Sequence, residues 1–247
     1  MKSSERHKIK ENEFAHTVAR TRDMVNERPR EVATITIAVL AVALALGGFF
    51  AWKASRDGKA TSLLASALAV AEAPVVTPPP PAPGSAPPVQ PPGSFRTERE
   101  KLEASVPLLQ RAADAYPNND AGITARYRLA ATLAELARYA EAEQRYQEVV
   151  QKAGARSIYR YTARLGVGEA QLAQGKGDAA VTTFRELSTD ATSTLPVDGV
   201  LMQLGRAALQ AGKKDDATRA FTRVVDEFPQ SLYAVEAKEK IAGLKKV

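Results

Sequence analysis

The chain has 247 residues, a net charge of +6, two histidines and no cysteine. Without cysteine it can form no disulfide, no thiolate nucleophile and no cysteine metal site. Both histidines, His7 and His16, precede residue 32, so residues 95–247 lack the commonest catalytic base as well. We therefore expect no metal, no cofactor and no enzymatic activity.

The basic excess is spread thinly along the chain. Residues 95–247 hold 23 Lys/Arg and 20 Asp/Glu. Proteins that bind nucleic acid usually gather their basic residues in a patch or stripe. The balance of charges here is typical of solvated helix faces, and we expect no nucleic-acid partner.

Residues 1–31 are charged and mixed in sign, and they are predicted to form a cytosolic tail. Residues 32–52 carry no charged side chain. As a helix they would rise roughly 31 Å, about the thickness of the hydrocarbon core of a bilayer. Phe49, Phe50 and Trp52 cluster at one end, where aromatic rings favour the membrane interface. The segment predicts a transmembrane helix in the lipid bilayer, too long for the core of a cleaved signal peptide.

The orientation of this span rests on a small charge difference. Within about 20 residues of the span there are four Lys/Arg on its amino side and three on its carboxyl side. This favours a cytosolic amino terminus. A short tail before a large carboxyl-terminal domain suits an anchor in the bacterial inner membrane, with the domain in the periplasm.

Two segments separate the span from the rest of the chain. Residues 53–73 are predicted to be a juxtamembrane helix whose apolar face needs a partner, and the repeat domain is the nearest candidate. Residues 74–94 hold ten prolines and cannot form a packed core, which favours a stiff spacer. The alternative is an insertion in the turn of a degenerate hairpin, with residues 59–73 and 96–116 as its two helices.

Residues 95–247 contain one pattern three times: a small residue, an alanine twelve positions later, and an aromatic residue four positions after that. The copies are Ala130/Ala142/Tyr146, Gly168/Ala180/Phe184 and Gly205/Ala217/Phe221, recurring every 38 and 37 residues. A fixed period of this size predicts an all-α solenoid of helical hairpins. The predicted repeats lie near 123–156, 161–194 and 198–231, and a capping helix follows at 231–245.

These copies resemble the tetratricopeptide repeat (TPR). The third carries the resemblance best, with Leu204-Gly205, Ala217, Phe221 and a closing Pro229. The first two lack the proline, and the period is longer than the 34 residues usual in that family. We place the extra residues in the turns between repeats.

The resemblance implies that the first helix of each hairpin lines a concave groove, which commonly holds a peptide or protein segment. The groove positions, carried over onto this chain, include Tyr127, Ala131, Leu165, Glu169, Leu172, Met202, Arg206 and Leu209. The asparagine and lysine of the sub-family that clamps a carboxylate tail are absent from these positions, so we reject that mode of binding.

The layout of one span and an external repeat domain resembles the bacterial ancillary translocon subunit. That resemblance implies a scaffold with protein partners such as the translocon or periplasmic chaperones. The alternatives are the same scaffold facing the cytosol, a coordinator of envelope assembly or cell division, and an enzyme using Glu135, Glu141 and Glu143. The sequence names no partner and leaves the oligomeric state open.

Overall fold

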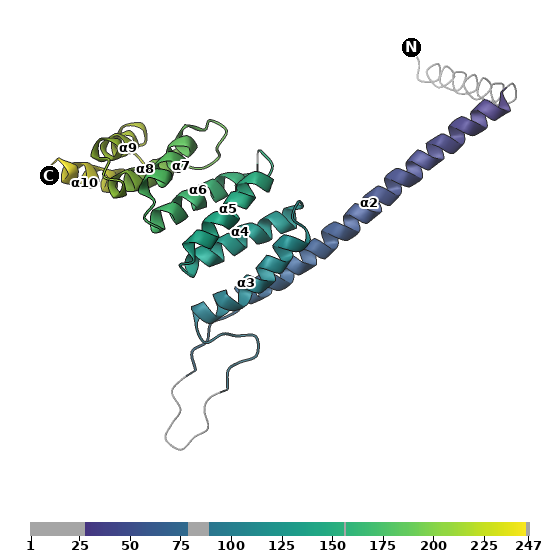
Figure 1. Ribbon diagram of the computed structural model, residues 1–247, viewed down its shortest axis with the longest axis horizontal. Helices are drawn as coiled ribbons and strands as arrows, with labels where there is room; N and C mark the ends of the chain where they lie inside the picture. Colours follow the sequence, from purple (N-terminus) through teal and green to yellow (C-terminus); the bar gives the residue numbers. More distant parts are fainter. Residues whose placement is uncertain (1–27, 79–88, 156, 246–247) are drawn as a thin grey trace, which may run out of the picture. The chain divides into compact units, whose positions relative to one another are not determined.

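The computed structural model describes residues 28–78, 89–155 and 157–245, and the predicted tail at 1–31 lies almost entirely outside them. Within these ranges the regular elements are helices (Figure 1). They are α2 (Pro29–Ala71), α3 (Glu98–Ala115), α4 (Asp120–Glu135), α5 (Tyr139–Lys152), α6 (Ile158–Ala173), α7 (Gly177–Thr189), α8 (Val197–Gln210), α9 (Lys214–Glu227) and α10 (Ala234–Leu244). The chain divides between Arg56 and Asp57 into two compact units, and α2 contributes to both. We call residues 57–247 the repeat unit.

The amino-terminal unit consists, in its described part, of the first half of α2. From Arg30 onward this helix is long and apolar enough, by length and composition, to cross a membrane. The hydroxyls of Thr34 and Thr36 donate to the carbonyls of Arg30 and Val32, each at 2.8 Å. The polar groups of these two threonines are therefore paired within the helix itself.

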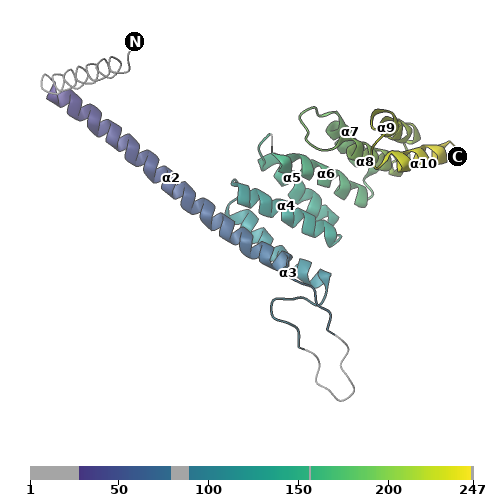
Figure 2. The same cartoon turned by 180° about the vertical axis from the view of Figure 1, so that it is seen from behind.

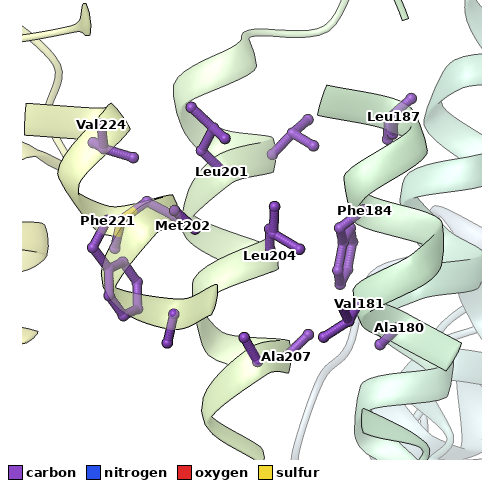
Figure 3. Packing of buried hydrophobic residues seen from close by; sticks show 14 of the residues in the cluster. Ala180, Val181, Phe184, Leu187, Leu201, Met202, Leu204, Ala207, Phe221 and Val224 are labelled. Atoms are coloured by element: carbon purple, nitrogen blue, oxygen red, sulfur yellow. The ribbon is translucent and has the colours of Figure 1, made fainter. Parts of the chain in front are cut away.

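In the second and third hairpins an aromatic ring packs directly against a glycine of the partner helix. A Cβ atom at Gly168 would overlap the ring of Phe184, and one at Gly205 would overlap the ring of Phe221. Figure 3 shows α8 packed between these two rings, with Leu204 toward Phe184 of α7 and Met202 toward Phe221 of α9. The predicted all-α solenoid of hairpins is confirmed.

In the first copy the aromatic ring packs against a glycine of the next hairpin. Its small position is Ala130, and Tyr146 finds its space against the next hairpin, where a Cβ at Gly166 would lie 2.6 Å from the ring of Tyr146. Tyr146 is 7% exposed. The glycine that admits this ring therefore belongs to α6, so the aromatic residue joins two repeats.

The three hairpin turns share one backbone conformation. Ala137, Gly175 and Gly212 follow α4, α6 and α8 with φ of 59°, 78° and 73°. In each turn the residue at positive φ donates to the carbonyl three residues earlier, at 2.9–3.0 Å, and the next residue donates to the carbonyl five residues earlier, at 2.8–2.9 Å. This is a glycine-type helix C-cap, and in the first turn an alanine occupies it.

A further hairpin precedes the three predicted ones, formed by the end of α2 and by α3. Figure 2 shows α3 beside the end of α2. Ala67 of α2 and Leu109 of α3 are fully buried in one core cluster, and Leu63 packs with Ala112 in another. The apolar face of this stretch of α2 therefore has its partner within the repeat unit.

The proline-rich segment connects these two helices, and its described ends lie together. Val76 N donates to Phe95 O at 2.8 Å, and Phe95 N donates to Pro74 O at 3.0 Å. The segment thus leaves and returns at the same place, which matches the alternative of an insertion in a turn. Residues 79–88 lie outside the described residues.

Ala137→Gly is expected to raise the free energy of unfolding. A non-glycine residue in the left-handed region costs roughly 1 kcal/mol, and glycine removes that cost. Urea titration of the full chain in detergent micelles, followed by circular dichroism, measures the change. The control is Ala65→Gly at an exposed position inside α2, which should lower stability by about 1 kcal/mol. Equal losses in both variants would contradict the strain at Ala137.

Gly205→Ala should instead destabilise the repeat unit. Overpacking against Phe221 costs about 1–3 kcal/mol, which exceeds the roughly 1 kcal/mol that alanine gains over glycine in a helix. Gly58→Ala is the matched control, because a Cβ there meets no atom within 4 Å. The same titration should show a loss at position 205 and no loss at position 58. A stabilised Gly205→Ala protein would rule out the close approach.

Candidate functional site

The first helices of the three hairpins form one continuous face. Helix α4 contacts α6, and α6 contacts α8, in addition to the contacts each makes within its own hairpin. Side chains that leave this row of helices on the side away from α5, α7 and α9 share a surface. We call this surface the inner face.

A pocket of about 390 Å³ lies on the inner face between α6 and α8. Two of its lining residues, Leu165 and Glu169, belong to the set predicted from the sequence. The others come half from α8 and half from the connections before α8 and before α10. Those that matter below are Leu195, Pro196, Asp198, Gln203, Leu232 and Tyr233.

The wall before α10 is attached to α8 by hydrogen bonds. Ser231 Oγ donates to Asp198 Oδ2 at 2.6 Å and accepts from Tyr233 N at 3.1 Å. The ring of Tyr233 then lies over Gly199, with 3.5 Å between a Cβ at position 199 and Tyr233 Cε2. The first turn of α8 therefore positions the segment that closes one end of the pocket.

The electrostatics of the pocket are set by two carboxylates. Gln203 Nε2 donates to Glu169 Oε1 at 3.2 Å. Burial raises the pKa of Glu169, and this hydrogen bond offsets only part of the rise. The side chain of Glu169 is nevertheless accessible to solvent. We therefore attribute the raised pKa to the protein atoms of the concave wall around the carboxylate. Among the described residues neither Glu169 nor Asp198 forms an ion pair.

Three of the predicted groove residues belong partly or wholly to the core. Leu172 and Leu209 are half-buried and pack against the same core cluster. Met202 is 1% exposed and lies in that cluster together with Ala237 of α10. Contrary to the prediction, Met202 is therefore unavailable to a partner, because it packs in the core toward Phe221 of α9 (Figure 3).

The remaining predicted residues surround the pocket at a distance or lie elsewhere on the inner face. Arg206 donates through Nη2 to both oxygens of Glu236, at 2.9 and 3.1 Å, which ties α8 to α10. Tyr127 packs its ring against that of Tyr159, with 5.4 Å between centroids. Ala131 is half-buried on α4. None of these three lines the pocket.

The predicted capping helix at 231–245 corresponds to α10, which begins later than expected. Leu232 lies before this helix and is 97% exposed, and Val235 within it is 68% exposed. Helix α10 begins after Leu232, and it buries Ala234 instead. Leu195 and Pro196 line the pocket but were not among the predicted groove residues. The sequence signal that could have indicated them is the period, because they lie in the connection that makes it longer than that of a standard repeat.

Of the three carboxylates considered for catalysis, Glu143 and Glu141 are hydrogen-bonded to neighbouring side chains and Glu135 is exposed. Burial on its own would raise the pKa of Glu143, but hydrogen bonds from Lys176, Gln171 and Gln174 outweigh it and lower the pKa. A hydrogen bond from Arg138 lowers the pKa of Glu141. Glu135 is exposed on α4. The described residues contain no cluster of acidic or histidine side chains that could hold a metal ion.

The comparisons with known proteins agree with this geometry. The tetratricopeptide repeat family model matches residues 200–231. No curated protein matches the chain. The TPR-like repeats of a putative kinesin light chain from Podosopora anserina are 15% identical and cover 60% of this chain and 79% of their own, with a TM-score of 0.52. MamA from Desulfovibrio magneticus RS-1 is 16% identical over 60% of this chain and 86% of its own, with a TM-score of 0.45. The hairpins thus have the fold of a TPR-like solenoid.

Proposed function

We propose that this TPR-like solenoid is the binding part of a membrane-anchored scaffold that holds a segment of another protein. The observation that carries the proposal is the pocket on the inner face between α6 and α8. Its volume of about 390 Å³ lies in the range of ligand sites. Its walls combine apolar side chains with a few polar ones, as in sites that fix a bound chain in one orientation.

The membrane part of the proposal concerns residues 32–52. Their apolar side chains are exposed around the whole helix, with Leu44 77% and Phe50 63% exposed. Leaving so much apolar surface in water is costly, whereas a bilayer covers it on every side. At the end of this segment the guanidinium of Arg56 lies 4.8 Å from the centre of the Trp52 ring, a pairing suited to the headgroup region.

For the location we propose the bacterial inner membrane, with the repeat unit in the periplasm. The support is the small excess of Lys/Arg on the amino side of the span and the layout of a short tail before a large domain. Partners in protein export, such as the translocon or periplasmic chaperones, follow from that layout. A scaffold facing the cytosol and a coordinator of envelope assembly or cell division are the competing hypotheses. We propose no catalytic role.

Because the chain has no cysteine, its orientation can be tested with single cysteines and no background. Cysteines replace Ser4, in the amino-terminal tail, and Ala179, which is exposed on α7. In intact cells stripped of their outer layers, a membrane-impermeant maleimide should label Ala179→Cys and leave Ser4→Cys unlabelled until the cells are lysed. The reverse pattern would establish the cytosolic scaffold.

A photo-crosslinking amino acid tests the pocket in native membranes. Placed at Leu232, which is 97% exposed at the pocket, it should give adducts with other proteins. Placed at Thr182, which is exposed on the second helix of its hairpin, it should give few. Equal capture at both sites, or none at Leu232, would mean that the partner binds another surface.

A further inference from the structure

The two carboxylates that line the pocket differ in their partners from three more enclosed carboxylates of the repeat unit. Glu143, Glu148 and Asp190 are largely enclosed, and each has a Lys or Arg nitrogen at 2.8–2.9 Å. Glu169 and Asp198 have none among the described residues. No lysine or arginine lines the pocket. The fold therefore brings two negative charges to one concave surface, and no cationic group among the described residues contacts either of them. Arg206, whose Nη1 donates to Gln203 Oε1 at 3.5 Å, is paired with Glu236.

An uncompensated carboxylate in a concave wall is electrostatically unfavourable. The wall displaces water that would otherwise stabilise the charge, and an opposite charge within a few ångströms would restore that stabilisation. Glu169 receives only the amide of Gln203, and Asp198 only the hydroxyl of Ser231. Both donors are neutral, so the site is complementary to a positive group and repels an acidic one.

The rim of the pocket adds an apolar requirement. Leu232 is 97% exposed and Tyr233 is 39% exposed, and both line the pocket together with Leu165 and Leu195. Val235, one turn further and 68% exposed, extends this apolar surface beyond the pocket. A free inorganic or small organic cation would leave the rim uncovered, whereas a protein segment with apolar side chains beside its charge would cover it.

We propose that the pocket recognises a protein segment in which a Lys or Arg side chain is flanked by apolar side chains. The cationic group enters the pocket that Glu169 and Asp198 share, and the flanking residues pack on Leu232 and Tyr233. This inference rests on the proposed function, and it adds the chemistry of the partner. The proposed ligand group is positively charged, whereas the sub-family that clamps a carboxylate tail binds a negatively charged group.

Peptide arrays test this with the full-length chain in detergent micelles as the probe. Each peptide has random flanks around a fixed Leu-X-Leu centre, where X is Lys, Arg, Gln or Glu. Binding should favour Lys and Arg over Gln and be weakest for Glu. Titration of the best Lys peptide in solution, by fluorescence anisotropy, then gives a dissociation constant for the wild type and its variants.

The decisive variant is Glu169→Gln with Asp198→Asn, which removes both charges while keeping the shape and the acceptors for Gln203 and Ser231. It should weaken the Lys peptide by about tenfold or more. The matched control is Asp226→Asn with Glu239→Gln, two exposed carboxylates outside the pocket, which changes the net charge equally. The control should bind as the wild type does. Leu232→Ser should also weaken binding, because the apolar flank loses its contact.

The outcomes separate this inference from the function on which it rests. Equal binding of all four peptide classes, or wild-type affinity in the Glu169→Gln/Asp198→Asn protein, overturns the cationic specificity and leaves a protein-binding pocket. Absence of binding by every class overturns both. Spermidine that binds as tightly as the Lys peptide, in a manner independent of Leu232→Ser, overturns the assignment to a protein segment. Thermal melting of each variant shows that binding changes do not come from unfolding.

Discussion

The contact on which the repeat unit depends is an aromatic ring pressed against the backbone of the neighbouring helix. Phe184 and Phe221 are fully buried, and each occupies space that a Cβ atom of Gly168 or Gly205 would fill. This lets the two helices of a hairpin approach closely while a large apolar group is removed from water. Tyr146 uses Gly166 of the following hairpin in the same way, so the contact also joins one repeat to the next.

One helix extends from the amino-terminal unit into the repeat unit. Helix α2 is continuous from Pro29 to Ala71, and its second half packs Ala67 against α3 as the first helix of a hairpin. Within the repeat unit, buried Arg126 of α4 joins α3 and α5, because its Nη2 donates to the carbonyl of Ala113 at 2.9 Å and its Nε lies 2.9 Å from Glu148. The two ends of the proline-rich segment between α2 and α3 meet where Val76 N donates to Phe95 O.

The pocket arises where the repeats are least regular. The connection before α8 supplies Leu195 and Pro196, and the connection before α10 supplies Leu232 and Tyr233. Helices α6 and α8 provide the remaining lining residues, among them Leu165, Glu169, Asp198 and Gln203. The two charged groups of the pocket therefore lie on regular helices, whereas the irregular connections add apolar side chains to its wall.

The sequence alone determined the uncharged helix at 32–52, the period of the solenoid, and the pairing of Gly168 and Gly205 with Phe184 and Phe221, because these depend on local spacing. Tertiary structure decided what local spacing cannot encode. Met202 has the periodicity of a groove residue, yet it is buried in the core beside Phe221 of α9 (Figure 3). Leu232 has the periodicity of a buried one, yet the helix begins after it. The composition of the proline-rich segment does not predict that Val76 pairs with Phe95, because that contact depends on how α2 and α3 pack. Whether an apolar side chain is core or surface is set by the elements that reach it from elsewhere in the chain.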